Sequence, residues 1–424
     1  MLPSAPRLLA INNYYYRRGG SEAIFFEHNH MLEELGWEVV PFSMQHPSNL
    51  PTPWSRYFVD EIEMNGDYSL AQKLTRLPKV IYSIEARRRL GELLEVAPPD
   101  IAHAHNIYHH ISPSILALLK GRGIPTVLTL HDLKIACPAY NMLAPQGICE
   151  QCKGGKVYNV LRNRCIGGSA AASLVVMVEA IVHKVLGSYR RHVDRFIVPS
   201  RFYIEKFNEW GMPRSMFRHV PNFVDVNKYT LRQGTGEAFL YFGRVIRQKG
   251  VGTLIRAVAG AGQKLLVAGT GPEMEEMQKL ASSLNADVTF LGHLGGQQLQ
   301  EVIGACRAVV LPSEWYENAP VSVLEAYALG KPVIGARIGG IPELIRENVT
   351  GACFESGDVA SLQNVLEEYA SRPASVLQEM GRAGRQWVEE DFTVEMYRQR
   401  IMSVYRDLGV RLASETPLPL SASS

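Results

Sequence analysis

Short apolar runs alternate along the chain with longer segments in which apolar residues recur at helical spacing. The runs predict buried strands at residues 8–11, 37–42, 101–105, 126–130, 193–198, 239–242, 264–268, 288–291, 308–311 and 333–334. Helical spacing is clear over residues 21–35, 170–186 and 394–408. Because strands that alternate with helices are typical of a parallel sheet, the pattern predicts an α/β protein.

The alternation occurs twice, which predicts two doubly wound domains. A chain of 424 residues is long enough for two cores. We expect the first domain at residues 1–197, with a cysteine-rich insertion at 137–165, and the second at 198–390. Residues 391–410 should form a last helix. Residues 411–424 are rich in Ser and Pro and are expected to be disordered.

Residues 312–340 carry two glutamates, Glu317 and Glu325, across the start of an apolar-periodic segment. Asn318 can cap a helix there, and Pro320 suits the first turn. Eight residues of helix rise about 12 Å, so two carboxylates on one helix face would span an extended ligand. In glycoside hydrolases the carboxylates stand closer, at about 5 to 9.5 Å. The simpler alternative is a solvated helix face with two unrelated glutamates.

A second pattern follows the strand at residues 239–242. Arg244 comes directly after it, and Lys249 precedes the next helix. In an open α/β sheet, ligands bind in the crevice at the carboxyl ends of the strands. Two cations beside helix N–H groups would suit a pyrophosphate. Two ordinary surface cations are the alternative.

Together these motifs resemble the retaining glycosyltransferases of family 4, which have the GT-B fold of two Rossmann-like domains facing a central cleft. The similarity runs from about residue 7 to about residue 405. It is carried, in order, by Gly19-Gly20-Ser21-Glu22, Thr129-Leu130-His131-Asp132, Val198-Pro199-Ser200, Val220-Pro221-Asn222-Phe223-Val224-Asp225, Gly243-Arg244 with Lys249-Gly250, Ala268-Gly269-Thr270-Gly271-Pro272-Glu273 and the two-glutamate segment. Where many members have Gly-Phe-Gly after the first glutamate, this chain has Asn318-Ala319-Pro320. That form is similar to members that build bacterial surface polysaccharides.

The resemblance implies an enzyme that moves a sugar from a UDP- or GDP-linked donor to a saccharide or lipid-linked acceptor, with retention of configuration. It implies that Arg244 and Lys249 neutralise the leaving diphosphate, that Glu317 lies near the sugar, and that Glu325 accepts hydrogen bonds from the ribose. It also implies donor contacts at His131, Gly19, Gly20, Gly269, Gly271, Asn318 and Ala319. The leaving phosphate takes the acceptor's proton in such chemistry, so no cofactor is expected in catalysis. The last helix would return to the first domain.

Local alternatives exist for two of these assignments. His131 and Asp132 could form a structural hydrogen-bonded pair, and Gly19-Gly20 could be a simple tight turn. Alternatives to transfer itself are a nucleotide-sugar epimerase on the same fold and a non-catalytic scaffold. A dinucleotide-dependent oxidoreductase is disfavoured, because the first strand is not followed by G-x-G-x-x-G and Gly269-Thr270-Gly271 lacks a third glycine.

Four of the six cysteines lie in one segment: Cys137, Cys149, Cys152 and Cys165. In an intracellular chain this spacing favours structural zinc over disulfides, with reduced thiols as the alternative. A second candidate ligand set is His103, His105, His109 and His110. His103 and His105 would point to one side of a strand, but ordinary strand positions are the simpler interpretation.

The bulk composition is that of an ordinary globular protein. The net charge of +2 gives no reason to expect a nucleic-acid partner. The first residues hold too short an apolar run for a signal peptide or a membrane span, which predicts a cytoplasmic location. The apolar segment 170–186 has basic neighbours, so we expect contact with an anionic membrane, on its inner face. A buried core helix is the alternative.

Overall fold

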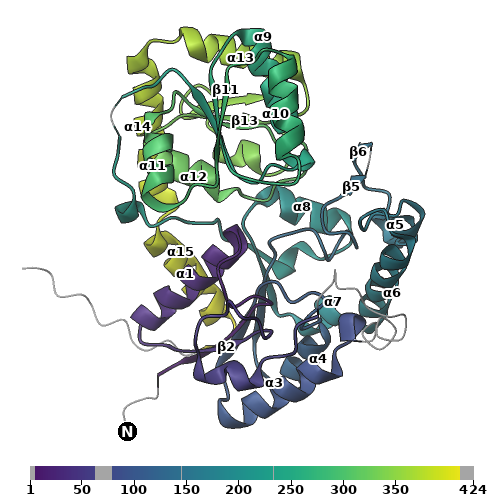
Figure 1. Cartoon of the computed structure of the whole chain (residues 1–424). Helices are drawn as coiled ribbons and strands as arrows, with labels where there is room; N and C mark the ends of the chain where they lie inside the picture. The colour runs from purple at the N-terminus through teal and green to yellow at the C-terminus, as the bar shows by residue number, and fades with distance from the viewer. Residues whose placement is uncertain (1–4, 63–78, 145, 233, 411–424) are drawn as a thin grey trace, which may run out of the picture.

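The computed structural model describes residues 5–62, 79–144, 146–232 and 234–410, which form two stacked α/β domains (Figure 1). The first domain is built on a parallel sheet with strand order β2-β1-β3-β4-β7-β8. Its strands are β1 (Arg7–Ile11), β2 (Glu38–Phe42), β3 (Ile101–Ala104), β4 (Thr126–Thr129), β7 (Arg195–Val198) and β8 (Phe217–His219). The predicted strands of this half are confirmed, and β8 is an addition.

The second domain has a parallel sheet with the order β11-β10-β9-β12-β13-β14. Its strands are β9 (Phe239–Phe242), β10 (Leu265–Ala268), β11 (Val288–Gly292), β12 (Val309–Leu311), β13 (Val333–Ala336) and β14 (Gly351–Phe354). The strand order reverses between β9 and β12, and that switch point is where ligands bind in doubly wound folds. The loops after β9 and β12 carry the candidate residues.

Both sheets are buried on both faces, which explains why their strands are short apolar runs. In β1, Leu9 and Ile11 join one core cluster, whereas Leu8 and Ala10 join another on the opposite face. This follows from the two-residue period of a strand. Parallel strands need crossover connections, and the helices that make them cover the faces.

Helices flank both sheets, and the predicted α6 and α15 are confirmed. The first domain has α1 (Gly20–Glu34), α3 (Ile84–Val96), α4 (Ser114–Gly121), α5 (Asn159–Arg162), α6 (Ala170–Leu186), α7 (Ser188–His192) and α8 (Arg201–Glu209). The second has α9 (Val251–Ala261), α10 (Met274–Ser283), α11 (Gly296–Ala305), α12 (Val321–Ala328), α13 (Val359–Ser371) and α14 (Ala374–Asp391), followed by α15 (Val394–Asp407). Short 3-10 turns are η1 (Pro53–Tyr57), η2 (Lys153–Gly155), η3 (Arg214–Met216), η4 (Val226–Lys228), η5 (Arg247–Lys249) and η6 (Ile341–Leu344).

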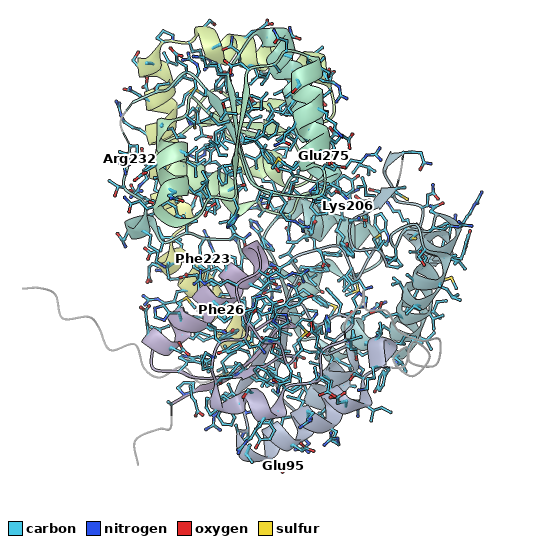
Figure 2. The ribbon with its side chains drawn as sticks, in the orientation of Figure 1. Phe26, Glu95, Lys206, Phe223, Arg232 and Glu275 are labelled. Carbon is cyan, nitrogen blue, oxygen red and sulfur yellow. The ribbon has the colours of Figure 1, made fainter. Side chains whose placement is uncertain are left out.

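The change from the first sheet to the second falls later in the chain than the expected boundary after residue 197. β8 pairs with β7, and Phe207 and Phe217 stack within the first core. The chain then crosses to the second sheet between β8 and β9. α15 lies beside α1 (Figure 1). Its Tyr397 stacks on Phe223 with ring centroids 4.2 Å apart, and Figure 2 labels Phe223. The tail predicted at 411–424 lies outside the described residues.

The cysteine-rich insertion forms a separate edge of the first domain. It holds a two-stranded antiparallel hairpin of β5 (Leu143–Ala144) and β6 (Gly147–Ile148), followed by α5 and α6. Figure 1 shows these elements on the side of the domain opposite α1 and α15. No helix in the described ranges is long and apolar enough to cross a membrane.

Candidate active site

Glu317 lies in the extended loop between β12 and α12, at the switch point of the second sheet. The prediction that it stands on a helix face with Glu325 is wrong, because α12 begins only at Val321, with Pro320 as its N-cap residue. The prediction that Asn318 caps the helix is also wrong. Its side chain instead spans two elements of the first domain. Oδ1 accepts from Ser200 Oγ at 2.8 Å, and Nδ2 donates to the Leu130 carbonyl at 2.9 Å.

The carboxylate of Glu317 is buried and held by three donors on one oxygen. Oε1 accepts hydrogen bonds from Lys249 Nζ at 2.6 Å, Ser313 Oγ at 2.7 Å and Trp315 Nε1 at 2.7 Å. Burial by itself would raise the pKa of Glu317, but the Lys249 charge and the three hydrogen bonds outweigh it and hold the pKa below its ordinary value. Oε2 receives no hydrogen bond from the described residues, so one face of the anion remains available.

Two close backbone contacts fix the loop that carries Glu317. Gly250 has φ +67°, and a Cβ there would lie 1.9 Å from the Pro312 carbonyl oxygen. Gly339 has φ +60°, and a Cβ there would meet the backbone of Glu317 at 2.4 Å. Both positions therefore require glycine. These contacts seat Lys249 and Glu317 against each other.

Arg244 follows β9 directly, as expected. Its side chain is exposed and makes no hydrogen bond or ion pair within the described part of the chain. Gly269 and Gly271, after β10, pack against the backbone of this loop: a Cβ would lie 1.8 Å from the Gly243 carbonyl oxygen and 2.0 Å from that of Val245. Packing thus accounts for both glycines. Their predicted contact with a ligand stays a prediction.

Glu325 is the one glutamate of the pair on α12. Its Oε1 accepts a hydrogen bond from the Tyr229 hydroxyl at 3.2 Å. Burial raises the pKa of Glu325, and the Tyr229 hydroxyl lowers it only in part. This half-buried carboxylate has one donor among the described residues and therefore unused acceptor capacity, which suits hydroxyl groups of a ligand.

His131 follows the carboxyl end of β4 in the first domain. The alternative that it pairs with Asp132 is wrong: its Nε2 shares a 2.8 Å hydrogen bond with Nδ1 of His105. Burial lowers the pKa of His131 to about 4, so the ring is neutral at pH 7. Because Asn318 donates to the Leu130 carbonyl, the structure brings His131 to the loop that carries Glu317.

Of the other predicted histidines, His103 belongs to a buried chain of polar contacts behind this pair, which also includes His28. His109 lies instead beside Glu179, at 3.6 Å, and His110 Nδ1 accepts from the Ile62 N–H at 3.3 Å, so the four predicted histidines do not form one ligand set. His103 lies between the Tyr405 hydroxyl and Thr129 Oγ1, each at 2.7 Å. His28 bonds the hydroxyls of Tyr397 and Tyr405. The hydrogen bonds of His103 go to hydroxyl groups of the protein, which explains this buried histidine without a metal.

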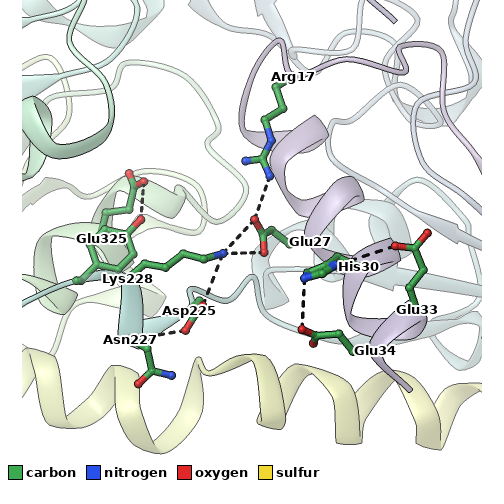
Figure 3. A network of polar contacts seen from close by, with 10 residues as sticks. Arg17, Glu27, His30, Glu33, Glu34, Asp225, Asn227, Lys228 and Glu325 are labelled. Carbon is green, nitrogen blue, oxygen red and sulfur yellow. Dashed lines mark hydrogen bonds and ion pairs between the residues drawn. The ribbon is translucent and has the colours of Figure 1, made fainter. Parts of the chain in front are cut away.

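Gly19 and Gly20 begin α1 and are exposed. A Cβ on Gly20 would meet no atom within 4 Å, so nothing within the protein requires the glycine. The neighbouring Arg17 is tied to Glu27, which also pairs with Lys228 of the second domain's linker (Figure 3). Such exposed ion pairs contribute little to stability. They do show that the Gly19-Gly20 loop lies near Lys228, whose neighbour Tyr229 bonds Glu325.

The four cysteines Cys137, Cys149, Cys152 and Cys165 line one small cavity of about 10 Å³, and all are free thiols. Burial and mutual repulsion raise the pKa of Cys152 to about 12. Among the described residues, no three Cys, His, Asp or Glu side chains already stand in metal-binding geometry. The zinc assignment therefore stays a prediction.

Sequence reasoning missed several side chains that complete the site. Ser313 and Trp315 were within reach of a local argument, since they flank Glu317 in sequence. Tyr229 gave no local signal, because 96 residues separate it from Glu325. His105 was considered only as a metal ligand, and its hydrogen bond with His131, 26 residues away, was not predicted. Glu150 of the insertion was also missed. Its carboxylate accepts hydrogen bonds from Lys206, labelled in Figure 2, and from the hydroxyl of Tyr316, the residue before Glu317.

Two Rossmann-like domains, with the Lys249–Glu317 pair at the switch point of the second sheet, are consistent with a GT-B transferase. Known sequence families agree. The family "Glycosyltransferase Family 4" matches residues 18–228, and "Glycosyl transferases group 1" matches residues 227–387. The chain therefore belongs to the family 4 glycosyltransferases. It is an enzyme that transfers a hexose from a nucleotide-sugar donor, and the epimerase and scaffold alternatives are not favoured.

Individual relatives are distant but cover most of the chain. N-acetyl-alpha-D-glucosaminyl L-malate synthase of Bacillus anthracis is 26% identical over 92% of this chain and 94% of its own length. Among solved structures, sucrose-phosphate synthase from Thermosynechococcus elongatus superposes with TM-score 0.71 and 20% identity, covering 96% of this chain and 99% of its own. HepE from Anabaena, in complex with UDP and glucose, has TM-score 0.67 and 16% identity over 95% and 100%. Both structural likenesses support the GT-B fold.

Proposed function

We propose that this enzyme transfers a hexose from a UDP- or GDP-linked donor to a saccharide or lipid-linked saccharide, with retention, in the synthesis of a cell-surface polysaccharide or glycolipid. The observation that carries the proposal is the buried Glu317 carboxylate, which is bound on one oxygen by Lys249, Ser313 and Trp315 and free on the other. A fixed anion beside a cation suits a sugar that develops positive charge while its diphosphate leaves.

Each side of the site then has a role. Arg244 and Lys249 neutralise the departing diphosphate, and Glu325 with Tyr229 receives the ribose hydroxyls. Neutral His131, buttressed by His105, contacts the donor sugar from the first domain. The leaving phosphate accepts the proton of the acceptor hydroxyl on the same face of the sugar, so the protein supplies no base.

A relative and the surface of α6 favour a lipid-linked acceptor and action at a membrane. One relative, from Corynebacterium glutamicum, is named a GDP-mannose-dependent mannosyltransferase of a phosphatidylinositol mannoside, and it is 27% identical over 50% of this chain and 62% of its own. A lipid acceptor would bring the enzyme to the cytoplasmic face of a membrane. The exposed apolar side chains of α6 are in keeping with that location.

A thermal-shift panel with UDP, GDP, ADP, CMP and NAD tests the donor site. We expect UDP or GDP to raise Tm by several degrees, since a ligand at 100 times its Kd stabilises by about 2.7 kcal/mol. Arg244→Ala should remove most of that rise without lowering the Tm of the free protein, because Arg244 has no partner in the described structure. Stabilisation by NAD alone would contradict the proposal. Arg88→Ala, an exposed arginine of the first domain, is the control.

We also propose structural zinc at the four cysteines. Protein purified without chelator should contain about one zinc per chain by plasma mass spectrometry, since a set of four cysteine thiolates is a common structural zinc site. Cys152→Ser should lower the content, whereas Cys353→Ser, outside the cavity, should not. Metal-free protein with all thiols reactive towards a thiol reagent would show that the cysteines are simply reduced.

A further inference from the structure

Helix α6 exposes an apolar stripe along one face. Leu174, Val178, Ile181 and Val185 have exposed fractions of 45%, 36%, 42% and 73%. Their spacing of four, three and four residues places them on one side of a helix. An aligned row of this kind differs from singly scattered surface apolar residues, which need no explanation.

The opposite face of α6 is held against the first domain by buried polar contacts. The buried Glu179 carboxylate pairs with Lys134 Nζ at 2.8 Å, and His183 Nε2 bonds the Ile81 carbonyl at 2.7 Å. Rolling the helix to hide the stripe would break a buried ion pair, which is strongly unfavourable. The exposure of the stripe is therefore a stable property of the fold.

The chain segment that carries the stripe is basic. Residues 153–192 contain a single acidic residue, the buried Glu179. Six exposed cations of this stretch form no ion pair with any described residue: Lys156, Arg162, Arg164, Lys184, Arg190 and Arg191. Figure 1 shows α5 and α6 along one edge of the first domain, with α7 between α6 and α4. An apolar row with unpaired cations around it is complementary to an anionic, partly apolar surface.

We propose that the α6 stripe and its six cations dock the enzyme on a membrane that contains anionic lipids. The stripe enters the headgroup boundary while the cations meet lipid phosphates. Apart from Leu186 at the end of the helix, the exposed large apolar residues of α6 lie on one face, so the helix lies in the plane of the interface. A second copy of the chain fits less well, because it would bring two sets of unpaired cations together. The inference deepens the proposed function, since it names the partner surface that a lipid-linked acceptor requires.

Vesicle co-sedimentation of the full chain tests the docking. We expect binding to vesicles of phosphatidylcholine with about a third phosphatidylglycerol, and little binding to phosphatidylcholine alone. Lys184→Gln with Arg190→Gln should weaken partitioning roughly 30-fold, at about 1 kcal/mol per cation. Ile181→Asn with Val185→Asn should weaken it at least about tenfold, through lost apolar burial. Val349→Asn, a 49% exposed residue of the second domain, and Lys264→Gln are the matched controls.

Three outcomes would overturn the inference. The first is no binding to either vesicle, and the second is binding that the α6 variants leave unchanged. The third is a dimer, detected by light scattering, that the Ile181/Val185 variant dissociates, because the occupant of the stripe is then a second copy. All α6 variants should keep the Tm rise with nucleotide. Vesicle binding without any nucleotide response would refute the proposed function but not the docking, so the two failures are distinguishable.

Discussion

Replacing Glu317 with glutamine is expected to reduce sugar transfer by about 10² to 10³-fold, the size of effect seen when one preorganised electrostatic group is removed from an active site. Glutamine keeps the shape of the side chain but carries no charge, so the developing positive charge of the sugar loses its counter-charge. The nucleotide-dependent Tm rise should largely remain, because Arg244 and Lys249 are still present. Initial rates with a saturating donor, compared with nucleotide titrations, measure the two effects separately.

Glu314→Gln is the matched control for this variant. Glu314 lies in the same loop, but its Oε1 accepts from Thr253 Oγ1 at 2.6 Å, and Lys249 Nζ pairs with Glu317 instead. We expect the control to keep transfer within a few-fold of the wild type. Equal activity of Glu317→Gln and wild type would remove the proposed role of Glu317.

Replacing Lys249 with methionine is expected to affect both stability and donor binding. Breaking a fully buried ion pair destabilises by about 3 to 5 kcal/mol. The Lys249 side chain is 26% exposed, so we expect a smaller loss of about 2 kcal/mol in the free energy of unfolding. The nucleotide should no longer raise Tm appreciably, because one of the two cations that neutralise the diphosphate is gone. Urea unfolding and thermal shift check the two effects, with Lys264→Met as the control.

The stability loss in Lys249→Met should depend on pH in a definite direction. In the wild type the pKa of Glu317 is lowered, so its stabilising contribution is present above the ordinary value of 4.5 and is lost as pH falls below it. Without the cation, burial is less opposed and raises the pKa, so the variant carries an unfavourable buried charge at pH 7. The difference between wild type and variant should therefore shrink from pH 7 to pH 4. A constant difference would mean that the two side chains are not coupled.

The sequence predicted the strands well, because each strand of a sheet buried on both faces is a local apolar run between polar segments. It predicted less well where elements end. The Glu317 loop illustrates the reason: Asn318 and Pro320 are good local signals for a helix start. Tertiary contacts decided otherwise, since the Asn318 side chain bonds Ser200 and the Leu130 carbonyl instead of the helix backbone.

For the candidate site, too, the sequence predicted some features and not others. Arg244, Lys249, Glu317, Glu325 and His131 were identified from motifs, because each has a fixed place relative to a strand end. Their contacts were not, because Tyr229 and His105 reach Glu325 and His131 from other parts of the chain. Glu150 likewise reaches Tyr316, next to Glu317, from the insertion. The hydrogen-bond partner of a side chain depends on the tertiary structure and cannot be predicted from the neighbouring sequence.

The sequence by itself determined the α/β architecture, the chemical groups of the site and the apolar character of residues 170–186. Only the tertiary structure decided that Glu317 stands before its helix, that His131 bonds His105, and that α6 turns an apolar face outward. The physical reason is common to all three. Periodicity and motif spacing are local quantities, whereas orientation depends on which distant groups, such as Lys134 beneath Glu179, hold an element in place.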